Sequence, residues 1–357
     1  MRLGILTGGG DAPGLNAVIR AVVRAAMRTY DWPAVLGIPE GFKGLVEKKE
    51  PIELTPYRTR GLINQGGTIL HTTNRANPFQ YPVSEGEYTD RSDAVLERMA
   101  ELEMDALVVL GGDGSLTIAH DLARKGVPIV GTPKTIDNDI QGTELCFGHM
   151  TAVETATDAL DKLHTTAESH HRVMVVEMMG RYAGWLTLRS GIAGAADAAL
   201  LPEIPFDPDR VCDGINARAQ AGSPFSIVAV AEGAAPKGGD MAILQAGEGV
   251  YQPRLGGIGA RIADSLKECT NLDTRFTVLG HVQRGGPPGA TDRLLATQYG
   301  VAAVDALARG EKDAMVALRG EQLTTVPLAE VVGGFRGIPT DHPLLDTARQ
   351  TGLILGE

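Results

Sequence analysis

The sequence has no run of lysines or arginines, although 33 of its 357 residues are basic. Acidic residues number 44, and the formal net charge is −11. Proteins that bind nucleic acids usually present a basic face to the phosphate backbone, so this composition predicts no nucleic-acid partner. The arginines stand singly inside glycine-rich segments instead, which favours a small anionic ligand.

Cysteine is scarce as well. Cys146, Cys212 and Cys269 are the only three, and the sequence contains no CxxC pair and no HExxH segment. It therefore predicts no zinc site. We expect three reduced thiols, as in most cytoplasmic proteins.

Long hydrophobic runs are missing too. No apolar stretch approaches the roughly 18 residues of a membrane span. The residues from Met1 to Thr7 lead into glycines too early for a signal peptide. These absences predict a cytoplasmic protein with no membrane partner.

Glycine, by contrast, is abundant, with 45 residues that gather in short runs. Such runs are typical of tight loops in which the backbone closely approaches another group. They follow apolar segments that we expect to be strands, and apolar residues at helical spacing come next. The expected strands are 3–7, 106–110, 127–130, 173–176, 227–231 and 276–279, and the expected helices are 15–26, 116 onward, 151–163 and 291–307.

Strands that alternate with helices predict an α/β fold with a mostly parallel sheet. The chain length suggests two domains. In such sheets, ligands bind at the carboxyl ends of the strands. Because the distinctive loops of this sequence each follow a predicted strand, we expect them to line a common cleft.

The first of these loops is Thr7–Gly14, with the sequence TGGGDAPG. Glycines before a helix leave backbone N–H groups free to hold a phosphate. No Lys-Ser/Thr pair follows at the spacing of a P-loop, and Pro13 replaces the last glycine of a dinucleotide fingerprint. An ordinary strand-to-helix turn explains the segment equally well.

The second loop is Gly111–Ser115, in which Asp113 lies between glycines. Magnesium usually takes one or two protein carboxylates, while phosphate oxygens and water complete its shell. Asp113 therefore suits a magnesium ion beside nucleotide phosphates. The alternative is a tight turn with aspartate as the turn residue.

The third loop, Pro133–Asp139, carries Asp137 and Asp139. Two residues apart, these side chains would point the same way in extended backbone. One carboxylate would then accept a proton while the other binds metal or orients the first. An Asx-rich turn is the alternative interpretation.

Isolated charged residues near other strand ends add candidate anion sites. Arg181 lies in MGRYAGW (179–185), where a neighbouring glycine lets the guanidinium approach a phosphate. Each such side chain, taken alone, is equally compatible with a solvated surface. The same alternative applies to the other candidates for binding a phosphate or sugar hydroxyls: Arg172, Glu232, Arg275, His281 and Arg284.

Together these features are the parts of a phosphoryl-transfer site. Their combination closely resembles the 6-phosphofructokinase family, and the resemblance runs nearly end to end. It is carried by GILTGGGDAPGLNAVIR (4–20), PKTIDNDI (133–140), ESHHRVMVVEMMGRYAGW (168–185), AEG (231–233) and VLGHVQRGGPPGATDRLLAT (278–297).

The resemblance implies two Rossmann-like three-layer α/β domains with mostly parallel sheets and an active site in the cleft between them. Residues 1–148 plus 283–335 would bind the phosphoryl donor and magnesium, and residues 149–282 plus 336–357 would bind fructose 6-phosphate. The implied reaction moves the γ-phosphoryl of ATP to the sugar 1-hydroxyl and gives fructose 1,6-bisphosphate, a step of glycolysis. The resemblance also implies a homo-oligomer, either dimer or tetramer, with active sites shared between subunits.

The family motifs assign roles to individual residues. Asp137 would be the general base toward the 1-hydroxyl, and Asp113 would serve the magnesium. The further catalytic residues would be Thr135, Asp139 and Arg181. The donor would be bound by Gly10, Arg75, Gly112, Asp113, Gly114, Ser115 and Lys134. The sugar phosphate would be bound by Thr135, Asp137, Arg172, Met179, Gly180, Arg181, Glu232, Arg275, His281 and Arg284, with Arg172 and Arg275 reaching over from a neighbouring subunit.

Two residues point to different donors. Many pyrophosphate-using relatives carry an aspartate at the position of Gly114, where it would crowd and repel the α-phosphate of a nucleotide. Lys134, however, is typical of pyrophosphate-using relatives. A steric and electrostatic clash usually discriminates more strongly than one added attraction. We therefore expect ATP, with a pyrophosphate-dependent phosphotransferase as the alternative.

Three rival functions have specific objections. Other kinases with a GGDG loop, such as NAD or lipid kinases, lack the TIDND and MGR segments. A sugar-phosphate sensor on the same fold need not keep Asp113 and Asp137, and fold alone would not decide. A nicotinamide-dependent oxidoreductase would need an unbroken GxGxxG after a strand, which is absent from this sequence.

Overall fold

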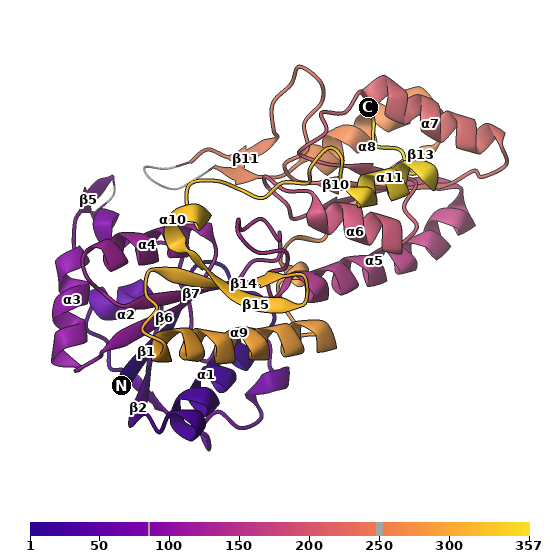
Figure 1. Ribbon diagram of the computed structural model, residues 1–357. Coiled ribbons are helices and arrows are strands. Elements are labelled where there is room, and N and C mark those ends of the chain that lie inside the picture. The colour runs from indigo at the N-terminus through magenta and orange to yellow at the C-terminus, as the bar shows by residue number, and fades with distance from the viewer. Residues whose placement is uncertain (85, 248–252) are drawn as a thin grey trace. The chain divides into compact units, whose positions relative to one another are not determined.

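The computed structural model describes residues 1–84, 86–247 and 253–357 (Figure 1). The chain folds into two compact units. Unit 1 comprises Met1–Ile136, Ile140–Thr151 and Arg284–Phe335, and unit 2 comprises Asp137–Asp139, Ala152–Gln283 and Arg336–Glu357. The segment Asp137–Asp139 thus packs with unit 2, although the residues on both sides of it belong to unit 1.

Over its described residues, unit 1 contains one seven-stranded sheet in the order β15-β14-β7-β6-β1-β2-β3 (Figure 1). The central strands pair in parallel, while β3 and β15 pair antiparallel at the two edges. The strands are β1 (Arg2–Thr7), β2 (Ala34–Ile38), β3 (Ile52–Leu54), β6 (Ala106–Gly111), β7 (Ile129–Pro133), β14 (Ala314–Arg319) and β15 (Gln322–Pro327). A small antiparallel pair, β4 (Tyr81–Ser84) and β5 (Glu87–Thr89), lies outside this sheet.

Helices cover both faces of the unit 1 sheet because its strands are apolar on both faces. Leu3 and Ile5 of β1 pack with α1 (Leu15–Thr29) and α9 (Ala290–Ala308) on one face. Leu6 points to the opposite face, where it packs in a hydrophobic cluster with four other helices. Those helices are α2 (Phe42–Val46), α3 (Ser92–Glu101), α4 (Asp113–Arg124) and α10 (Leu328–Val331). The result is a three-layer α/β unit.

Unit 2 is a smaller three-layer unit around a parallel sheet, whose four strands among the described residues have the order β13-β8-β10-β9. The strands are β8 (Arg172–Met178), β9 (Ala198–Leu200), β10 (Ser226–Ala231) and β13 (Asp273–Val278). On one face, α7 (Pro208–Gln220) and α8 (Ile258–Thr270) bury Val173, Val228 and their neighbours. On the other face, α6 (Trp185–Ala193) packs through Gly191 against Ala199 and Ala229.

The remaining elements complete the chain. They are η1 (Leu62–Asn64), η2 (Pro78–Gln80), α5 (His149–His170), β11 (Ile243–Gln245), β12 (Arg254–Leu255), η3 (Gly280–Gln283) and α11 (Pro343–Gln350). Within the described ranges, no helix is both long enough and apolar enough to span a membrane.

The expected α/β fold is confirmed. The differences concern element boundaries and strands that were not expected, among them β2, β9, β14 and β15. The strand expected at 127–130 is β7 at Ile129–Pro133, and the helix expected at 151–163 is the longer α5. The helix expected from residue 116 begins at Asp113, so the aspartate is a helix residue and not a turn residue. Helix boundaries are difficult to predict from the local sequence because capping and packing decide where a helix begins and ends.

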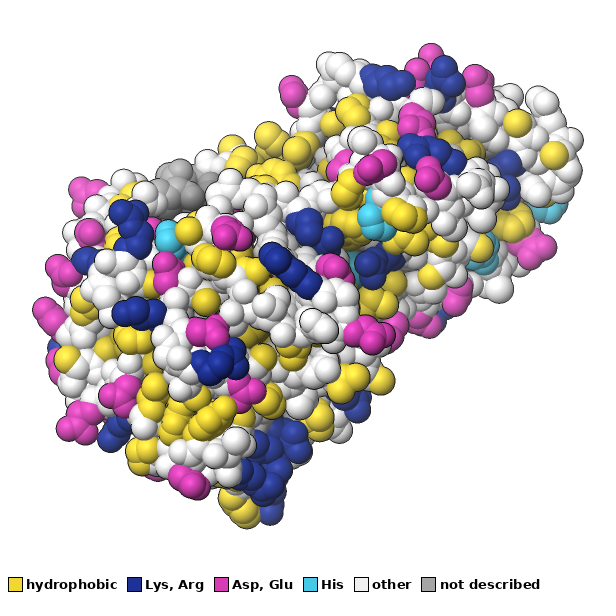
Figure 2. Space-filling view, in the orientation of Figure 1, with side chains coloured by type: hydrophobic (Ala, Val, Ile, Leu, Met, Phe, Trp, Pro, Cys, Tyr) yellow, Lys and Arg dark blue, Asp and Glu magenta, His cyan; other side chains and the backbone are white. Residues whose placement is uncertain are grey.

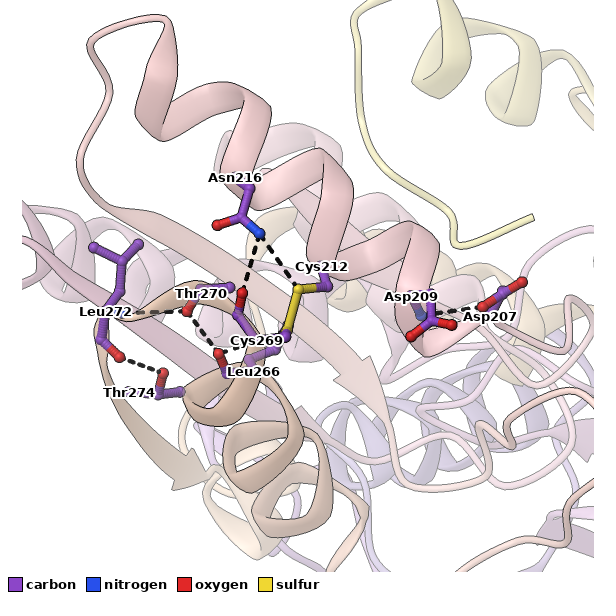
Figure 3. Close-up of a disulfide and its surroundings, with 9 residues drawn as sticks. All are labelled: Asp207, Asp209, Cys212, Asn216, Leu266, Cys269, Thr270, Leu272 and Thr274. Atoms are coloured by element: carbon purple, nitrogen blue, oxygen red, sulfur yellow. Dashed lines mark hydrogen bonds between the residues drawn. A yellow bond between two sulfur atoms is a disulfide. The ribbon is translucent and has the colours of Figure 1, made fainter.

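The expectation of three reduced cysteines is wrong for two of them. Cys212 on α7 and Cys269 on α8 form a disulfide, with Cα atoms 6.3 Å apart, although 57 residues separate them in sequence (Figure 3). The side chain of Asn216 donates hydrogen bonds to Cys212 Sγ at 3.5 Å and to the Cys269 carbonyl at 3.2 Å. Cys146 is a buried free thiol. The two helices pack on the same face of the unit 2 sheet, and that packing brings the two sulfurs together.

Candidate active site

The distinctive loops of unit 1 leave one edge of its sheet side by side. Strands β1, β6 and β7 are neighbours and parallel, with Thr7 opposite Leu110 and Gly111 opposite Pro133. The chain therefore continues into the Gly8 loop, into Gly112 and into Lys134 at the same carboxyl edge. This edge is where open α/β sheets bind their ligands.

The first glycine loop is tied to its surroundings by its own amides. Gly8 donates its N–H to the Leu110 carbonyl at 2.9 Å, and Gly9 donates to the Thr73 carbonyl at 3.1 Å. The expectation that the glycine amides stay free for a phosphate is therefore wrong for these two. Gly14, with φ of 109°, begins α1 in a left-handed conformation that favours glycine.

Residues 71–75 form the segment that is bonded to the first glycine loop. The Thr72 hydroxyl donates to the Gly9 carbonyl at 2.6 Å, beside the Thr73 contact. Arg75 follows two residues later with an exposed side chain. The segment that carries Arg75 is thus fastened to the glycine loop by two consecutive residues, Thr72 and Thr73.

Asp113 is the first residue of α4, and Gly112 is the N-cap. A carboxylate at this position is stabilised by the N-terminal end of the helix dipole. Ser115, in contrast, is buried, and a Cβ added to Gly8 would lie 2.4 Å from its Oγ. The serine therefore packs beneath the first glycine loop and explains why residue 8 has no side chain. A Cβ at Gly114 would meet nothing within 4 Å, so the space next to Asp113 is open.

Lys134 lies against both glycine loops. Its side chain is buried, with 3% of the residue exposed, and its ammonium donates to the Gly10 carbonyl at 2.6 Å. Added Cβ atoms would lie 3.5 Å from Nζ at Gly9 and 3.9 Å from it at Gly112. Lys134 is therefore a fixed positive charge at this edge and holds Gly10 in place.

Arg284 also lies against the first glycine loop. Its Nη1 donates to the Asp11 carbonyl at 3.1 Å, and the same atom would lie 3.1 Å from a Cβ on Gly10. Both residues belong to unit 1. The structure thus puts a second fixed cation beside Gly10.

The loop with the candidate base is not extended. Asn138 is fully buried and has a φ of 56°, in the left-handed region that asparagine tolerates better than most residues. The premise that Asp137 and Asp139 lie on extended backbone and therefore point the same way is wrong. Thr135, Asp137 and Asp139 are each partly exposed.

The sugar-site candidates of unit 2 gather at the carboxyl edge of its own sheet. Met179, Gly180 and Arg181 follow β8, Glu232 follows β10, and His281 lies in η3 just after β13. Adjacent parallel strands bring these loops together: the Glu232 N–H donates to the Met178 carbonyl at 2.8 Å. A Cβ on Gly233 would lie 1.8 Å from the Arg181 carbonyl oxygen, so only glycine fits beside that loop.

Arg181 is oriented by a hydrogen bond within unit 2. Its Nη2 donates to the Pro253 carbonyl at 2.7 Å, and its Cζ lies 5.7 Å from the centre of the Tyr182 ring. The neighbouring Met179 N–H donates to the side-chain oxygen of Gln283, which is fully buried.

Arg172 lies at the opposite end of the same sheet, and Arg275 lies midway along β13, opposite Met174. Arg172 is the first residue of β8, and its register partner on β13 is Asp273. Both arginines pair with the Asp273 carboxylate, Arg172 at 2.7 Å. At about 3.3 Å per residue, the strand from Arg172 to Met178 spans roughly 20 Å. The structure therefore does not bring Arg172 together with Met179, Glu232 and His281 of the same chain, and the side chain of Arg275 pairs with Asp273 toward the Arg172 end of the sheet.

Sequence reasoning missed a buried carboxylate beneath the sugar-site loop. Glu177 is 3% exposed and accepts hydrogen bonds from the N–H groups of Gly257, at 3.1 and 3.2 Å, and Gly259, at 2.8 Å. It thereby fastens the start of α8 to the end of β8, just before Met179. The available signal was a single acidic residue inside the apolar run VMVVEM (173–178).

The charges of the surface agree with the dispersed arginines of the sequence. On the described part of the face in Figure 2, Lys and Arg side chains stand in small groups among Asp and Glu. Among the described residues, no three His, Cys, Asp or Glu side chains are grouped as a metal site would require. Asp113, at the N-terminus of α4 beside the open space at Gly114, is a carboxylate of the kind that magnesium takes as a protein ligand.

Comparison with known proteins agrees with this arrangement. The profile of the phosphofructokinase family matches residues 2–307. The ATP-dependent 6-phosphofructokinase of Chloroflexus aggregans is 48% identical over 356 residues, which cover 100% of this chain and 98% of that protein. ATP-dependent 6-phosphofructokinase 2 of Clostridium perfringens is 46% identical, with 100% and 98% coverage.

Solved structures give the same result at the level of the fold. Pichia pastoris phosphofructokinase superposes with a TM-score of 0.79 and 34% identity, over 92% of this chain and 37% of the much longer yeast chain. The pyrophosphate-dependent phosphofructokinase of Marinobacter aquaeolei superposes with a TM-score of 0.80 over 99% of this chain and 88% of that one, but at 20% identity this likeness concerns the fold alone. From its sequence profile, its relatives and its fold, the chain belongs to the phosphofructokinase family.

Proposed function

We propose that this protein transfers the γ-phosphoryl of ATP to the 1-hydroxyl of fructose 6-phosphate and forms fructose 1,6-bisphosphate. The observation that carries the proposal is the side-by-side placement of Gly10, Asp113 and Lys134 at one sheet edge of unit 1. Glycine backbone, a carboxylate at a helix N-terminus and a fixed ammonium are the groups that hold the phosphates of a donor. The relatives named above are ATP-dependent 6-phosphofructokinases, which supports this reaction.

ATP is the proposed donor because the space at Gly114 is open. Apart from its chain neighbours and the backbone of its own helix, no atom lies within 4 Å of a Cβ at this position, so no side chain from elsewhere in the chain fills this space. In the sequence, Lys134 was interpreted as a mobile cation that favours pyrophosphate as the donor. In the structure, its ammonium is buried and donates to the Gly10 carbonyl. A lysine that supports the loop serves either donor, so its preference for pyrophosphate carries less weight than the open space at Gly114.

Magnesium is the proposed cofactor, and Asp113 is the residue that would hold it. When bound, the ion would supply positive charge that neutralises the negative charge developing during transfer. The donor side would further involve Gly10, Arg75, Gly112, Gly114, Ser115 and Lys134. Ser115 would act through the shape of the loop, because its hydroxyl is buried against Gly8.

Asp137 is the proposed general base. A carboxylate within hydrogen-bond reach of the sugar 1-hydroxyl would take its proton as the oxygen attacks the phosphorus. Thr135 and Asp139 would support it. Met179, Gly180, Arg181, Glu232 and His281 would contact the sugar phosphate, and their common sheet edge in unit 2 supports that assignment. Arg284 would contact it as well, from its position beside Gly10.

A second copy of the chain would complete the sugar-phosphate site. Arg172 lies roughly 20 Å from the Met179 edge, too far for one copy to place it on the same sugar phosphate. Arg275 stands midway along β13, opposite Met174, and its side chain pairs with Asp273 on the side away from that edge. The strand that carries Arg275, β13, is the edge of its sheet and exposes Phe276 (51%) and Val278 (53%). Apolar side chains on an open sheet edge are typical of a protein interface. We therefore propose a dimer or tetramer with shared sites. We also propose that the protein is located in the cytoplasm.

The test is an assay of fructose 1,6-bisphosphate formation from fructose 6-phosphate and Mg²⁺, with ATP and pyrophosphate in parallel. We expect product with ATP and a kcat/KM for ATP above that for pyrophosphate. A higher kcat/KM for pyrophosphate would reverse the donor assignment. No product with either donor, combined with tight binding of the sugar phosphate, would identify a sensor instead of an enzyme.

A further inference from the structure

The loop of the candidate base is held by a residue that no family motif singles out. The backbone N–H of Arg336 donates to the Asp139 carbonyl at 2.8 Å, and its guanidinium Nη2 donates to the Asn138 carbonyl at 2.9 Å. All of these residues belong to unit 2. One arginine thus binds two consecutive carbonyl groups directly after Asp137.

These two bonds act where the loop needs support. Asn138 is fully buried in a left-handed conformation, which a non-glycine residue adopts only when its surroundings hold it there. The carbonyls of Asn138 and Asp139 define the two peptide planes that follow this residue. Bonds to both planes fix the direction in which the backbone leaves Asp137, and with it the position from which the Asp137 carboxylate projects.

Arg336 is itself held by a buried aromatic ring. Its Cζ lies 4.5 Å from the centre of the Trp185 ring, and the Trp185 indole N–H donates to the Arg336 carbonyl at 2.9 Å. Trp185 is 1% exposed and is the first residue of α6. The cation–π contact of the guanidinium and the indole hydrogen bond to the Arg336 carbonyl together restrict the movement of this side chain.

A second tie joins the same segment to the sugar-site loop. The Glu203 carboxylate accepts N–H bonds from Gly184, at 3.0 and 3.1 Å, and from Ile338 at 2.8 Å. Burial raises the pKa of Glu203, and the backbone N–H donors oppose that rise. Gly184 closes the loop that begins at Met179 and contains Arg181. Residues 336–338 are therefore bonded to the base loop directly and to the end of the sugar loop through Glu203.

We infer that Arg336 is a positioning residue for the phosphoryl-transfer reaction: it sets the Asp137 loop relative to the loop of Met179–Arg181. The inference rests on the proposed function, because it assigns a purpose to the position of Asp137. Arg336 acts through the carbonyls of Asn138 and Asp139 and not by contact with the substrate.

The experiment compares Arg336→Ala and Arg336→Lys with Arg349→Ala. Arg349 lies on α11 of the same unit and pairs with Asp346 and Glu357 at the surface, so its variant matches the charge change. We expect Arg336→Ala to lower kcat about 10- to 100-fold, since a misplacement of about 1 Å costs that order of rate. The KM for ATP should stay within about twofold of wild type. The solvent deuterium isotope effect on kcat should rise, because proton removal becomes slower relative to the other steps.

Arg336→Lys should recover part of kcat, since an ammonium donates to a carbonyl but lacks the planar fork. It also carries the test if the alanine variant does not fold. Arg349→Ala should match wild type in every readout. Wild-type kcat and isotope effect in both Arg336 variants would overturn the inference. So would a loss of kcat that only follows the folded fraction with an unchanged isotope effect, or a rise confined to the KM for the sugar phosphate. Failure of the wild-type protein to phosphorylate fructose 6-phosphate would instead overturn the proposed function.

Discussion

Replacement of Asp137 tests the chemistry most directly. Asp137→Asn keeps the size of the side chain but removes its ability to take a proton. We expect kcat to fall by on the order of 10²–10⁴, with a smaller effect on either KM, because proton acceptance is needed in the transition state. Steady-state kinetics with fructose 6-phosphate and ATP measure this. Turnover close to that of wild type would remove Asp137 from the role of base.

Gly114 is the residue that tests donor choice. Because a Cβ there meets no atom within 4 Å, Gly114→Asp has room for its side chain. The new carboxylate would repel and crowd the α-phosphate of ATP, which pyrophosphate does not have. We expect kcat/KM for ATP to fall far more than any activity with pyrophosphate. Gly114→Ala is the matched control, since it adds a methyl group without charge and should keep most ATP activity. Equal loss with both donors in the aspartate variant would contradict the argument.

At the scale of elements, the disulfide between α7 and α8 deserves a direct measurement. It closes a loop of 57 residues, and such a crosslink stabilises mainly by restricting the unfolded chain. We expect a reductant to lower the free energy of unfolding by roughly 2–4 kcal/mol, as measured by urea denaturation. Cys269→Ser should show the same loss, and the reductant should have no further effect on that variant.

Thiol titration of the denatured protein gives an independent check. Without reductant, Cys146 should be the one thiol that reacts, and after reduction all three cysteines should react. Three reactive thiols in protein purified without reductant would contradict the disulfide. The result also bears on location, because structural disulfides are uncommon in a reducing cytoplasm.

The activity of the whole molecule should depend on residues that one subunit supplies to another. Arg275→Ala should raise the KM for fructose 6-phosphate about tenfold or more and leave the KM for ATP nearly unchanged, because one charge-assisted contact to the 6-phosphate is lost. If one copy supplies Arg275 to the Asp137 site of another, the two defects are complementary. Mixing Arg275→Ala with Asp137→Asn protomers should then restore part of the activity.

The complementation has its own control. Exchange of subunits must be demonstrated, for example by mass spectrometry of mixed oligomers. Mixed oligomers that form but stay inactive would argue that each chain builds its own site. A monomer in solution with full activity would contradict sharing as well.

Several features of this protein followed from local sequence patterns. Apolar segments such as VMVVEM and the glycine runs after them depend on nearest neighbours along the chain, so the alternation of strands and loops was predictable. The α/β class followed from that alternation. The family followed from motifs such as PKTIDNDI, in which a few adjacent residues carry most of the information.

Other features depended on contacts between residues far apart in the chain. The amides of Gly8 and Gly9 are occupied because Leu110 and Thr73 face them. Two cysteines pair because α7 and α8 share one sheet face. No local pattern reveals either contact, since both arise only when the sheet has assembled.

The candidate site also has features that depend on local sequence and features that depend on the folded chain. The types of its residues, such as Asp113 at a strand end and Arg181 beside a glycine, were legible in the sequence because their chemistry is local. Their placement was not: Arg172 lies at the end of the sheet opposite Met179, and Arg336 reaches the Asp137 loop from almost 200 residues away. Backbone preferences act over a few residues, whereas the direction of a strand and the packing of a distant arginine are decided by burial and hydrogen bonding in the folded chain.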